Sequence, residues 1–118
     1  MQGLHLTADL YGCGCEPALL ISPQRLTGLL RTEVAAAELA VVGEAVHRFE
    51  QAGVTAVLLL AESHLSVHTW PELGAVTLDV YVCNFGADNS IKAERLIERL
   101  TAAFAAAEPV IRRLQRGR

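Results

Sequence analysis

Residues 54–83, VTAVLLLAESHLSVHTWPELGAVTLDVYVC, decide the fold of this chain. Three extended segments are expected within them, at residues 54–60, 64–69 and 75–82, because branched and aliphatic side chains are frequent there. Pro71 and Gly74 mark a turn between the last two segments. The run therefore predicts neighbouring strands of one sheet.

The residues that precede this run extend the sheet. Residues 39–49 are rich in valine and are expected to pair antiparallel with residues 54–60, with Gly53 introducing the second strand. A further strand is expected over residues 4–10, where apolar and polar side chains alternate with period two. The glycines that follow this strand, from Gly12 onward, permit backbone angles that end it.

Two helices are expected to accompany the sheet. The first covers about residues 23–38, with Ser22 as its N-cap. The second is capped by Asp88 or Asn89, and Pro109 is expected to stop it. Its apolar stripe has helical spacing and consists of Ala93, Leu96, Ile97, Leu100 and Phe104.

The order strand, helix, several strands, helix favours an α+β fold. We expect a two-layer sandwich, in which a mostly antiparallel sheet carries two helices packed on one face. With 118 residues and no linker or repeat, the chain is expected to form a single domain over residues 1–118.

The composition indicates which classes of binding partner and which cellular location to expect. The net charge is −3, from 10 Lys and Arg against 13 Asp and Glu, so neither nucleic acid nor a membrane surface is expected as a partner. No apolar run approaches the ~20 residues that cross a bilayer, and no secretion signal is apparent, which predicts a cytoplasmic protein. The three cysteines are expected to be reduced thiols. The arginines near the C-terminus are expected to form a solvated end.

Several segments together resemble one known family. The longest is AESHLSVHTWPE at residues 61–72, and the others, in chain order, are HLTADLYGC at 5–13, HRF at 47–49, GVT at 53–55 and the strand-like run 76–83. These segments resemble the bacterial and archaeal S-adenosylmethionine decarboxylases, and the resemblance covers most of the chain.

The resemblance implies that the chain cleaves itself between Glu62 and Ser63, giving chains 1–62 and 63–118. In that family the serine hydroxyl attacks the preceding carbonyl, and the ester that results eliminates to leave a pyruvoyl group. This covalent cofactor, derived from Ser63, would accept the electrons released as carbon dioxide leaves the substrate. Chemistry alone would leave Ser63 as a serine that ends a strand and caps a turn.

The family's catalytic residues carry over to three further positions. His68 resembles the processing histidine, which removes the serine α-proton during ester elimination. Thr55 stands where the family usually has a serine paired with that histidine, and it keeps the hydroxyl. Cys83 resembles the cysteine that returns a proton to the substrate α-carbon, although a buried cysteine is commonly only a small hydrophobic residue.

The substrate is expected to be a small molecule of the amino-acid type. By the resemblance, Phe49 and Trp70 would hold adenine between aromatic faces, and Glu72 would accept hydrogen bonds from ribose hydroxyls. The plainer alternative is a pair of core aromatic residues with a solvated carboxylate. The family and the hydrophobic fraction of 52% favour a homodimer of cleaved protomers.

Other cofactors are disfavoured. Pyridoxal phosphate needs a lysine, and the only one, Lys92, is expected on an exposed helix. His64 and His68 are four residues apart, but in a strand and without an apparent third ligand, so no metal site is expected. Cys13 and Cys15 form a Cys-x-Cys pair, which is weak evidence for a metal.

Two alternative functions stay open. After Cys83 the family usually has a glycine and then an acidic-proline segment, whereas residues 84–90 read NFGADNS. This departure leaves ornithine or arginine as alternative substrates for the same pyruvoyl chemistry. A homologue that remains uncleaved and binds or regulates a partner is the alternative from another class.

Overall fold

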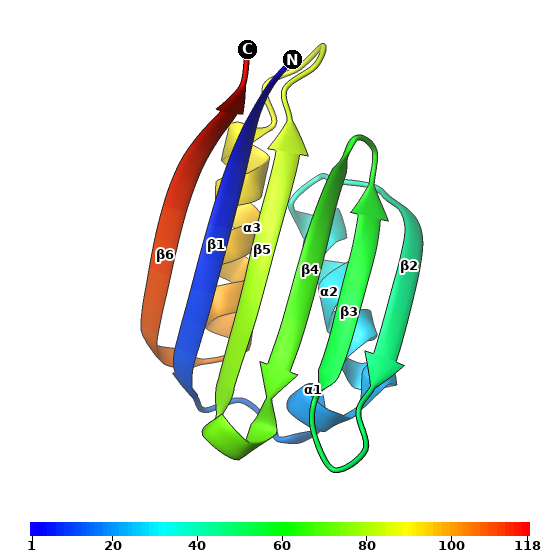
Figure 1. Cartoon of the computed structure of the whole chain (residues 1–118), viewed down its shortest axis with the longest axis vertical. Coiled ribbons are helices and arrows are strands. Elements are labelled where there is room, and N and C mark those ends of the chain that lie inside the picture. The colour runs from blue at the N-terminus through cyan, green and yellow to red at the C-terminus, as the bar shows by residue number, and fades with distance from the viewer.

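A computed structural model describes all residues from 1 to 118, and it contains one six-stranded antiparallel sheet in the order β2-β3-β4-β5-β1-β6 (Figure 1). The strands are β1 (Gln2–Cys13), β2 (Val41–Arg48), β3 (Val54–Leu60), β4 (Ser63–Trp70), β5 (Ala75–Cys83) and β6 (Ala106–Gly117). The expected strands are therefore present, and the expected two-layer α+β class is confirmed.

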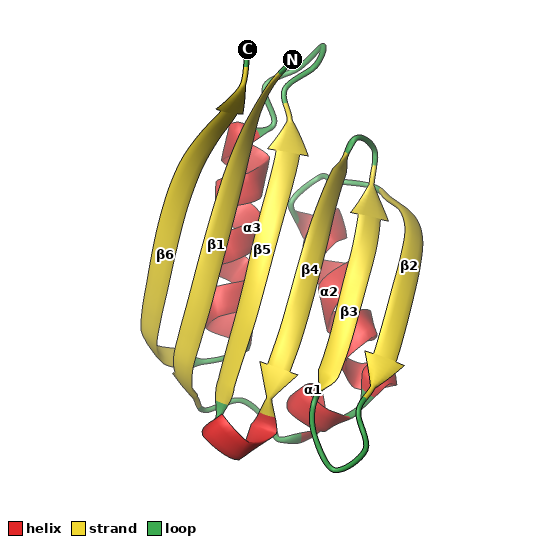
Figure 2. Ribbon diagram, in the orientation of Figure 1, coloured by secondary structure: helices red, strands yellow, loops and turns green.

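The helices all lie on one side of the sheet (Figure 2). They are the short α1 (Ala18–Ile21), α2 (Pro23–Ala36) and α3 (Ser90–Ala103), with a single 3-10 turn, η1 (Pro71–Leu73), between β4 and β5. None of the helices is long and apolar enough to span a membrane. The expected N-cap of α2 is present, since the Ser22 hydroxyl accepts a hydrogen bond from the Arg25 N–H at 3.2 Å.

The core lies between the helices and the sheet. Alternate residues of each central strand point toward the helices, as period-two patterning requires. In β1 these are Leu4, Leu6, Ala8 and Leu10, and in β5 they are Val76, Leu78, Val80 and Val82, all of them buried. The opposite side of the sheet, which no helix covers, is called the open face below (Figure 2). The residues that alternate with the core residues lie on it, and they include four of the expected site residues, Thr55, His68, Trp70 and Cys83.

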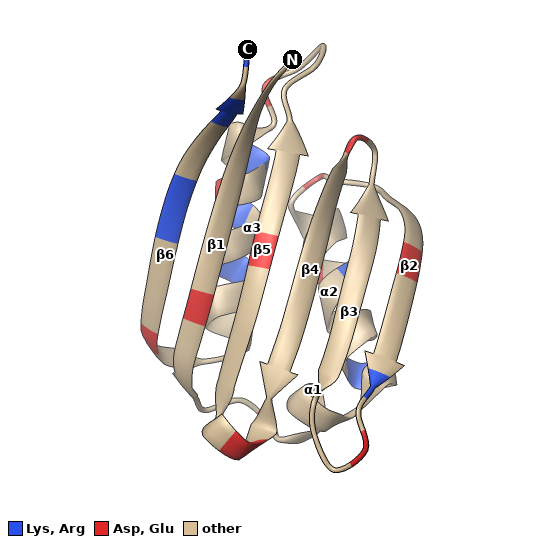
Figure 3. Ribbon diagram, viewed as in Figure 1, with Lys and Arg blue, Asp and Glu red and all other residues tan.

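The expected end of the second helix was wrong. Helix α3 ends at Ala103, and Pro109 lies within β6, where it pairs with Leu10 of β1. The chain leaves the helix because Ala105 adopts a left-handed conformation with φ 51°, which closes a helix C-terminus as a glycine usually does. The C-terminal arginines are exposed, as the expected solvated end requires, but all except Arg118 lie in an edge strand and not in a free tail (Figure 3).

Candidate functional site

The turn between β3 and β4 contains the expected scissile bond. Leu60 pairs with Ser63, so only Ala61 and Glu62 connect the two strands. Glu62 has a φ of 57°, in the left-handed region. That region costs a residue with a Cβ roughly 1–2 kcal/mol. The peptide bond directly before Ser63 is thus attached to a strained residue, and breaking this bond would release the strain.

Ser63 lies beside Cys83 at this end of the sheet. The backbone N–H of Cys83 donates a hydrogen bond to the Ser63 Oγ at 3.3 Å, so the first residue of β4 meets the last residue of β5. A cavity of about 330 Å³ adjoins them, and its lining residues are Met1, Glu62, Tyr81, Cys83 and Phe85. We call this region the serine end of the sheet.

A second cavity, of about 550 Å³, lies at the opposite end of β4. Five of the expected site residues line it: Phe49, Thr55, His68, Trp70 and Glu72. Residues of the β2–β3 loop complete the lining. Phe49 and Trp70 are 48% and 42% exposed, so their rings face the cavity and are not core aromatics. We call this region the aromatic end. Figure 1 shows that η1 and the β2–β3 loop lie at one end of the sheet and the β3–β4 turn at the other.

His68 is oriented by its neighbours on the adjacent strand. Thr55 and His68 are directly opposite each other on β3 and β4, and the Thr55 Oγ1 lies 2.9 Å from the His68 Nδ1. Nδ1 is therefore engaged, and Nε2 is left to face the cavity. The pairing that the resemblance implied for a serine is thus available to this threonine.

A close backbone contact shapes the aromatic end. The Phe49 N–H donates to the Gly53 carbonyl at 2.9 Å, which closes the β2–β3 loop. A Cβ at Gly53 would lie 1.9 Å from the carbonyl oxygen of Thr69, so no other residue fits there without a backbone shift. The buried Thr69 hydroxyl accepts from the Val54 N–H at 2.8 Å and donates to the Leu20 carbonyl at 2.7 Å.

The two ends are too far apart to form one site within one chain. Ser63 and His68 are five positions apart on β4, and at about 3.3 Å per residue their Cα atoms are roughly 16 Å apart. Proton transfer needs a donor and an acceptor about 3 Å apart, or one water between them. The structure therefore brings Ser63, Glu62 and Cys83 together at one end. Thr55, His68 and the three substrate-binding candidates lie together at the other end.

A polar cluster lies on the open face between the two ends, and sequence reasoning missed it. The Asp79 Oδ2 lies 2.8 Å from the His5 Nε2 and 2.9 Å from the His64 Nε2, while the Ser66 hydroxyl donates to Oδ1. Burial raises the pKa of Asp79, but the hydrogen bonds from Ser66, His5 and His64 outweigh it and hold that pKa below its ordinary value. Asp79 is the acidic position near the middle of β5 in Figure 3.

Only the strand register could have revealed this cluster. His5, His64 and Asp79 come from three different strands and are far apart in the sequence. His64 and Tyr81 are paired across β4 and β5, and His5 pairs with the same tyrosine from β1. His64 is thus placed with His5 and Asp79, while His68 faces the other end of the strand.

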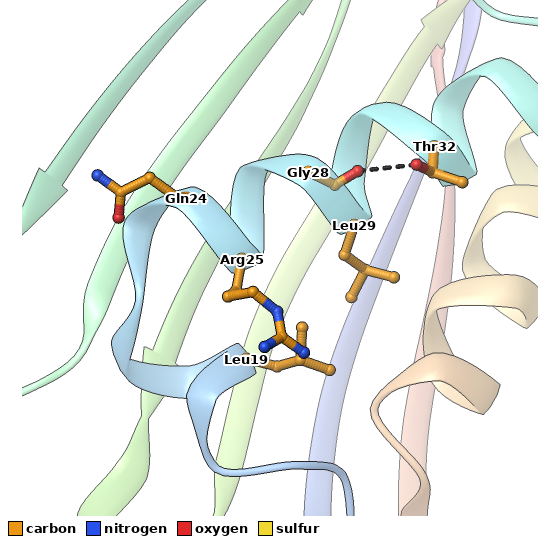
Figure 4. Close-up of a pocket in the computed structure, with 6 residues that line it drawn as sticks. All are labelled: Leu19, Gln24, Arg25, Gly28, Leu29 and Thr32. Carbon is orange, nitrogen blue, oxygen red and sulfur yellow. Dashed lines mark hydrogen bonds between the residues drawn. The ribbon is translucent and has the colours of Figure 1, made fainter.

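The remaining candidates lie elsewhere. Cys13 and Cys15 are half-buried, and burial is the main reason why the pKa of each thiol is raised. A hollow of about 410 Å³ on the outer surface of α1 and α2 contains none of the expected site residues (Figure 4). Its lining residues are Leu19, Gln24, Arg25, Gly28, Leu29 and Thr32.

Comparisons with known proteins find relatives that cover most of the chain. A Picrophilus torridus protein named S-adenosylmethionine decarboxylase proenzyme is 34% identical over 115 residues, which cover 98% of this chain and 84% of the relative. A Thermoplasma volcanium protein of the same name is 35% identical over the same shares of both chains. Among solved structures, the adenosylmethionine decarboxylase from Aquifex aeolicus VF5 is 34% identical and has a TM-score of 0.85, covering 98% of this chain and 90% of that one.

The fold and the serine end define the class of this protein, a carboxy-lyase related to decarboxylases that are made as proenzymes. The family model described as S-adenosylmethionine decarboxylase matches residues 4–117, and the chain belongs to that family.

Proposed function

We propose that this chain is an S-adenosylmethionine decarboxylase that cleaves itself between Glu62 and Ser63 into chains 1–62 and 63–118. The observation that carries the proposal is the left-handed Glu62 directly before a serine whose hydroxyl lies beside the N–H of Cys83. The turn leaves room for the attack because both of its residues are exposed. The names of the relatives support the proposal.

The active form is a homodimer, in which each active site contains the serine end of one chain and the aromatic end of the other. The separation of roughly 16 Å along β4 supports a site that is shared between two chains. Two sheets that pack through their open faces, about a two-fold axis perpendicular to the strands, bring each serine end over the partner's aromatic end. The midpoint between Ser63 and His68 on β4 falls between Leu65 and Ser66, so the axis passes near Ser66 and its pairing partner Asp79.

This arrangement gives each processing residue a role. The Ser63 hydroxyl attacks the carbonyl carbon of Glu62, the C–N bond breaks, and the freed amine keeps the proton from the hydroxyl. His68 of the partner subunit removes the Ser63 α-proton, and Glu62 leaves as the C-terminal carboxylate of chain 1–62. Water then replaces the nitrogen of the dehydrated residue and releases ammonia. The Thr55 hydroxyl orients His68 by its contact with Nδ1.

The residues at the serine end fit the pyruvoyl group that this cleavage would create. Such a group supplies a ketone for the substrate amine and an electron sink for the carbanion left by carbon dioxide. Cys83 meets residue 63 through its backbone N–H and also lines the adjoining cavity, where its thiol can return a proton to the substrate α-carbon. The adjoining cavity is lined mainly by apolar side chains, and these favour loss of a carboxylate charge.

The aromatic end favours a nucleoside substrate. Phe49 and Trp70 offer two exposed rings for a flat base, and Glu72 lies in the same cavity, where it can accept hydrogen bonds from ribose hydroxyls. Stacking contributes about 0.5–1.5 kcal/mol beyond burial. Ornithine and arginine have no flat ring system of this size and would leave these rings unused.

Intact-mass measurement and a release assay for carbon dioxide test the proposal. Purified protein is expected to give two fragments that meet at residues 62 and 63, and Ser63→Ala is expected to stay uncut and inactive. Ser66→Ala, the serine three residues further along β4, is the matched control and should be cut. Parallel assays with S-adenosylmethionine, ornithine and arginine identify the substrate. A single uncut polypeptide after long incubation would instead support a non-catalytic homologue.

The role of Cys83 needs a separate measurement. Cys83→Ala is expected to lower kcat more than it raises KM, because the thiol acts after the substrate has bound. An unchanged kcat would exclude Cys83 as the proton donor.

A further inference from the structure

The polar cluster on the open face has the donor set of a metal site. His5, His64 and Asp79 each offer one donor atom, and these atoms lie within 4.8 Å of one another. We propose that His5, His64 and Asp79 bind one divalent transition-metal ion per chain, with Zn²⁺ as the ion that the donors fit best. The proposal concerns residues outside the decarboxylation chemistry and does not depend on it.

The sheet holds the three residues at suitable positions. His5 and His64 both flank Tyr81, one from β1 and one from β4, and Asp79 is two residues before Tyr81 on the same face of β5. The positions therefore form a triangle on three adjacent, hydrogen-bonded strands. A rigid sheet orders the ligands in advance, which lowers the entropy lost on binding. All three side chains are half-buried in the single chain and lie on the open face, so in the proposed homodimer the two sites lie between the packed sheets.

The distances allow an ion with little rearrangement. Zn²⁺ lies about 2.0–2.1 Å from each nitrogen or oxygen ligand, so tetrahedral ligand atoms are about 3.3 Å apart. The two imidazole nitrogens lie 2.8 Å and 2.9 Å from the Asp79 Oδ2. These two separations have to increase by about half an ångström, and the two imidazole nitrogens, which lie no more than 4.8 Å apart, have to adopt the same spacing of about 3.3 Å; side-chain rotations provide both changes. Two imidazoles and one carboxylate leave the fourth position of a tetrahedral ion to water.

Protons compete with the metal for these atoms. In the absence of an ion, the Nε2 atoms of His5 and His64 donate to Asp79, and the Arg116 Nη1 lies 3.5 Å from the Nδ1 of His5. Binding of the ion requires the proton of His5 to move to Nδ1 and Arg116 to turn away. Arg116 is exposed on an edge strand and also lies 5.0 Å from the ring centre of Tyr81, so it has an alternative contact.

The carboxylate is suited to the ion. The hydrogen bond from Ser66 to the Oδ1 of Asp79 fixes the carboxylate and leaves Oδ2 for the ion. Nitrogen ligands disfavour Mg²⁺ and Ca²⁺, which prefer oxygen.

Calorimetric titration of the full-length protein with Zn²⁺ tests the site. The Cys13→Ser, Cys15→Ser double variant serves as the background, because the Cys-x-Cys pair is the other donor set that could take the ion. One Zn²⁺ per chain is expected. His5→Ala and His64→Ala should each weaken binding at least about tenfold, as removal of a supporting group already does. His47→Ala, a histidine on the same face but outside the cluster, is the matched control and should bind as the background does.

Co²⁺ provides a second measurement that does not depend on the folding of any variant. The unsubstituted protein with Co²⁺ should show the visible bands of a four- or five-coordinate site with nitrogen and oxygen ligands. The proposal is overturned if no stoichiometric binding is found. It is overturned equally if the cysteine double variant loses the ion, or if thermally stable His5→Ala protein binds Zn²⁺ with undiminished affinity.

Discussion

Co-expression of Ser63→Ala and His68→Ala chains with different affinity tags should restore a function that neither variant has alone. Ser63→Ala removes the nucleophile at the serine end, and His68→Ala removes the base at the aromatic end. In a mixed dimer, one of the two sites combines the intact Ser63 of one chain with the intact His68 of the other. The second site lacks both residues and stays inactive.

The expected yield follows from the arrangement. If two chains at equal levels pair at random, about half of the dimers are mixed and one of the two sites in each is intact. Activity should therefore recover to about a quarter of the wild-type value, and about half of the His68→Ala chains should be cut. Mass spectrometry of each tagged chain and release of carbon dioxide give the two values.

The control pairs two variants at the same end of the sheet. Co-expressed Ser63→Ala and Cys83→Ala chains leave no site with both residues, so no activity beyond that of Cys83→Ala should appear. The reasoning fails if this control pair complements as well as the first pair does. It also fails if Ser63→Ala and His68→Ala form mixed dimers without any cleavage, or if His68→Ala alone is cut at the wild-type rate.

Three further measurements test individual contacts. Thr55→Val keeps the shape of the side chain but removes the partner of the His68 Nδ1, so cleavage should slow by about threefold to tenfold, whereas Thr55→Ser should not slow it. Gly53→Ala should lower the free energy of unfolding by about 1–3 kcal/mol or more, because the new Cβ meets a backbone carbonyl. Gly28 lies within α2 with open space around it, so Gly28→Ala should raise the free energy of unfolding by about 0.5–1 kcal/mol. Urea denaturation measures both values. The pKa of Asp79 is lower in the folded protein than in the unfolded chain. The stabilisation that Asp79 provides is therefore present above the unfolded pKa and is lost as the pH falls through the folded pKa, so the stability difference between wild type and Asp79→Asn should be constant above about pH 5 and shrink below about pH 4. A difference that persists at low pH would contradict this assignment.

Most of the sheet could be predicted from sequence because it follows local patterns. Period-two alternation placed β1, and the valine-rich and leucine-rich runs placed β2 and β3. The N-cap at Ser22 and Pro23 gave the start of α2 correctly, but its end was placed two residues too late. Glu38 adopts a left-handed conformation with φ 64° just after the helix. Glycine is the usual residue in this conformation at a helix end, so the glutamate gave no sign in the sequence that the helix stops there.

Strand β6 was missed for the same physical reason. The alanines around residue 105 favour a helix by propensity, and no glycine shows that the helix ends at Ala103. Pro109 was expected only to stop the helix, but an edge strand accommodates proline. The pairing with β1, a contact between the two ends of the chain, decides the conformation, and no local pattern reports it.

The candidate site could be predicted residue by residue but not in its spatial arrangement. The motif gathers Ser63, His68 and Trp70 within eight residues of sequence, which suggests a single site. Because these residues lie in one extended strand, Ser63 is at one end of β4 and His68 and Trp70 are near the other end, although they are close in sequence. The cluster around Asp79 shows the opposite effect, since His5 lies 74 residues away in the sequence.

The strand order has a consequence for how such a protein must be made. The piece before residue 63 supplies β1, β2 and β3, and the piece after it supplies β4, β5 and β6. Because β1 lies between β5 and β6, three of the five strand interfaces, β3–β4, β5–β1 and β1–β6, join the two pieces. The intact precursor folds as one tethered polymer, whereas the cut protein, once denatured, would have to reassemble from two separate molecules at a rate that depends on their concentration. If the chain is cut between Glu62 and Ser63 as proposed, the scission must follow folding, and a cut molecule that has unfolded cannot refold by the route that first produced it.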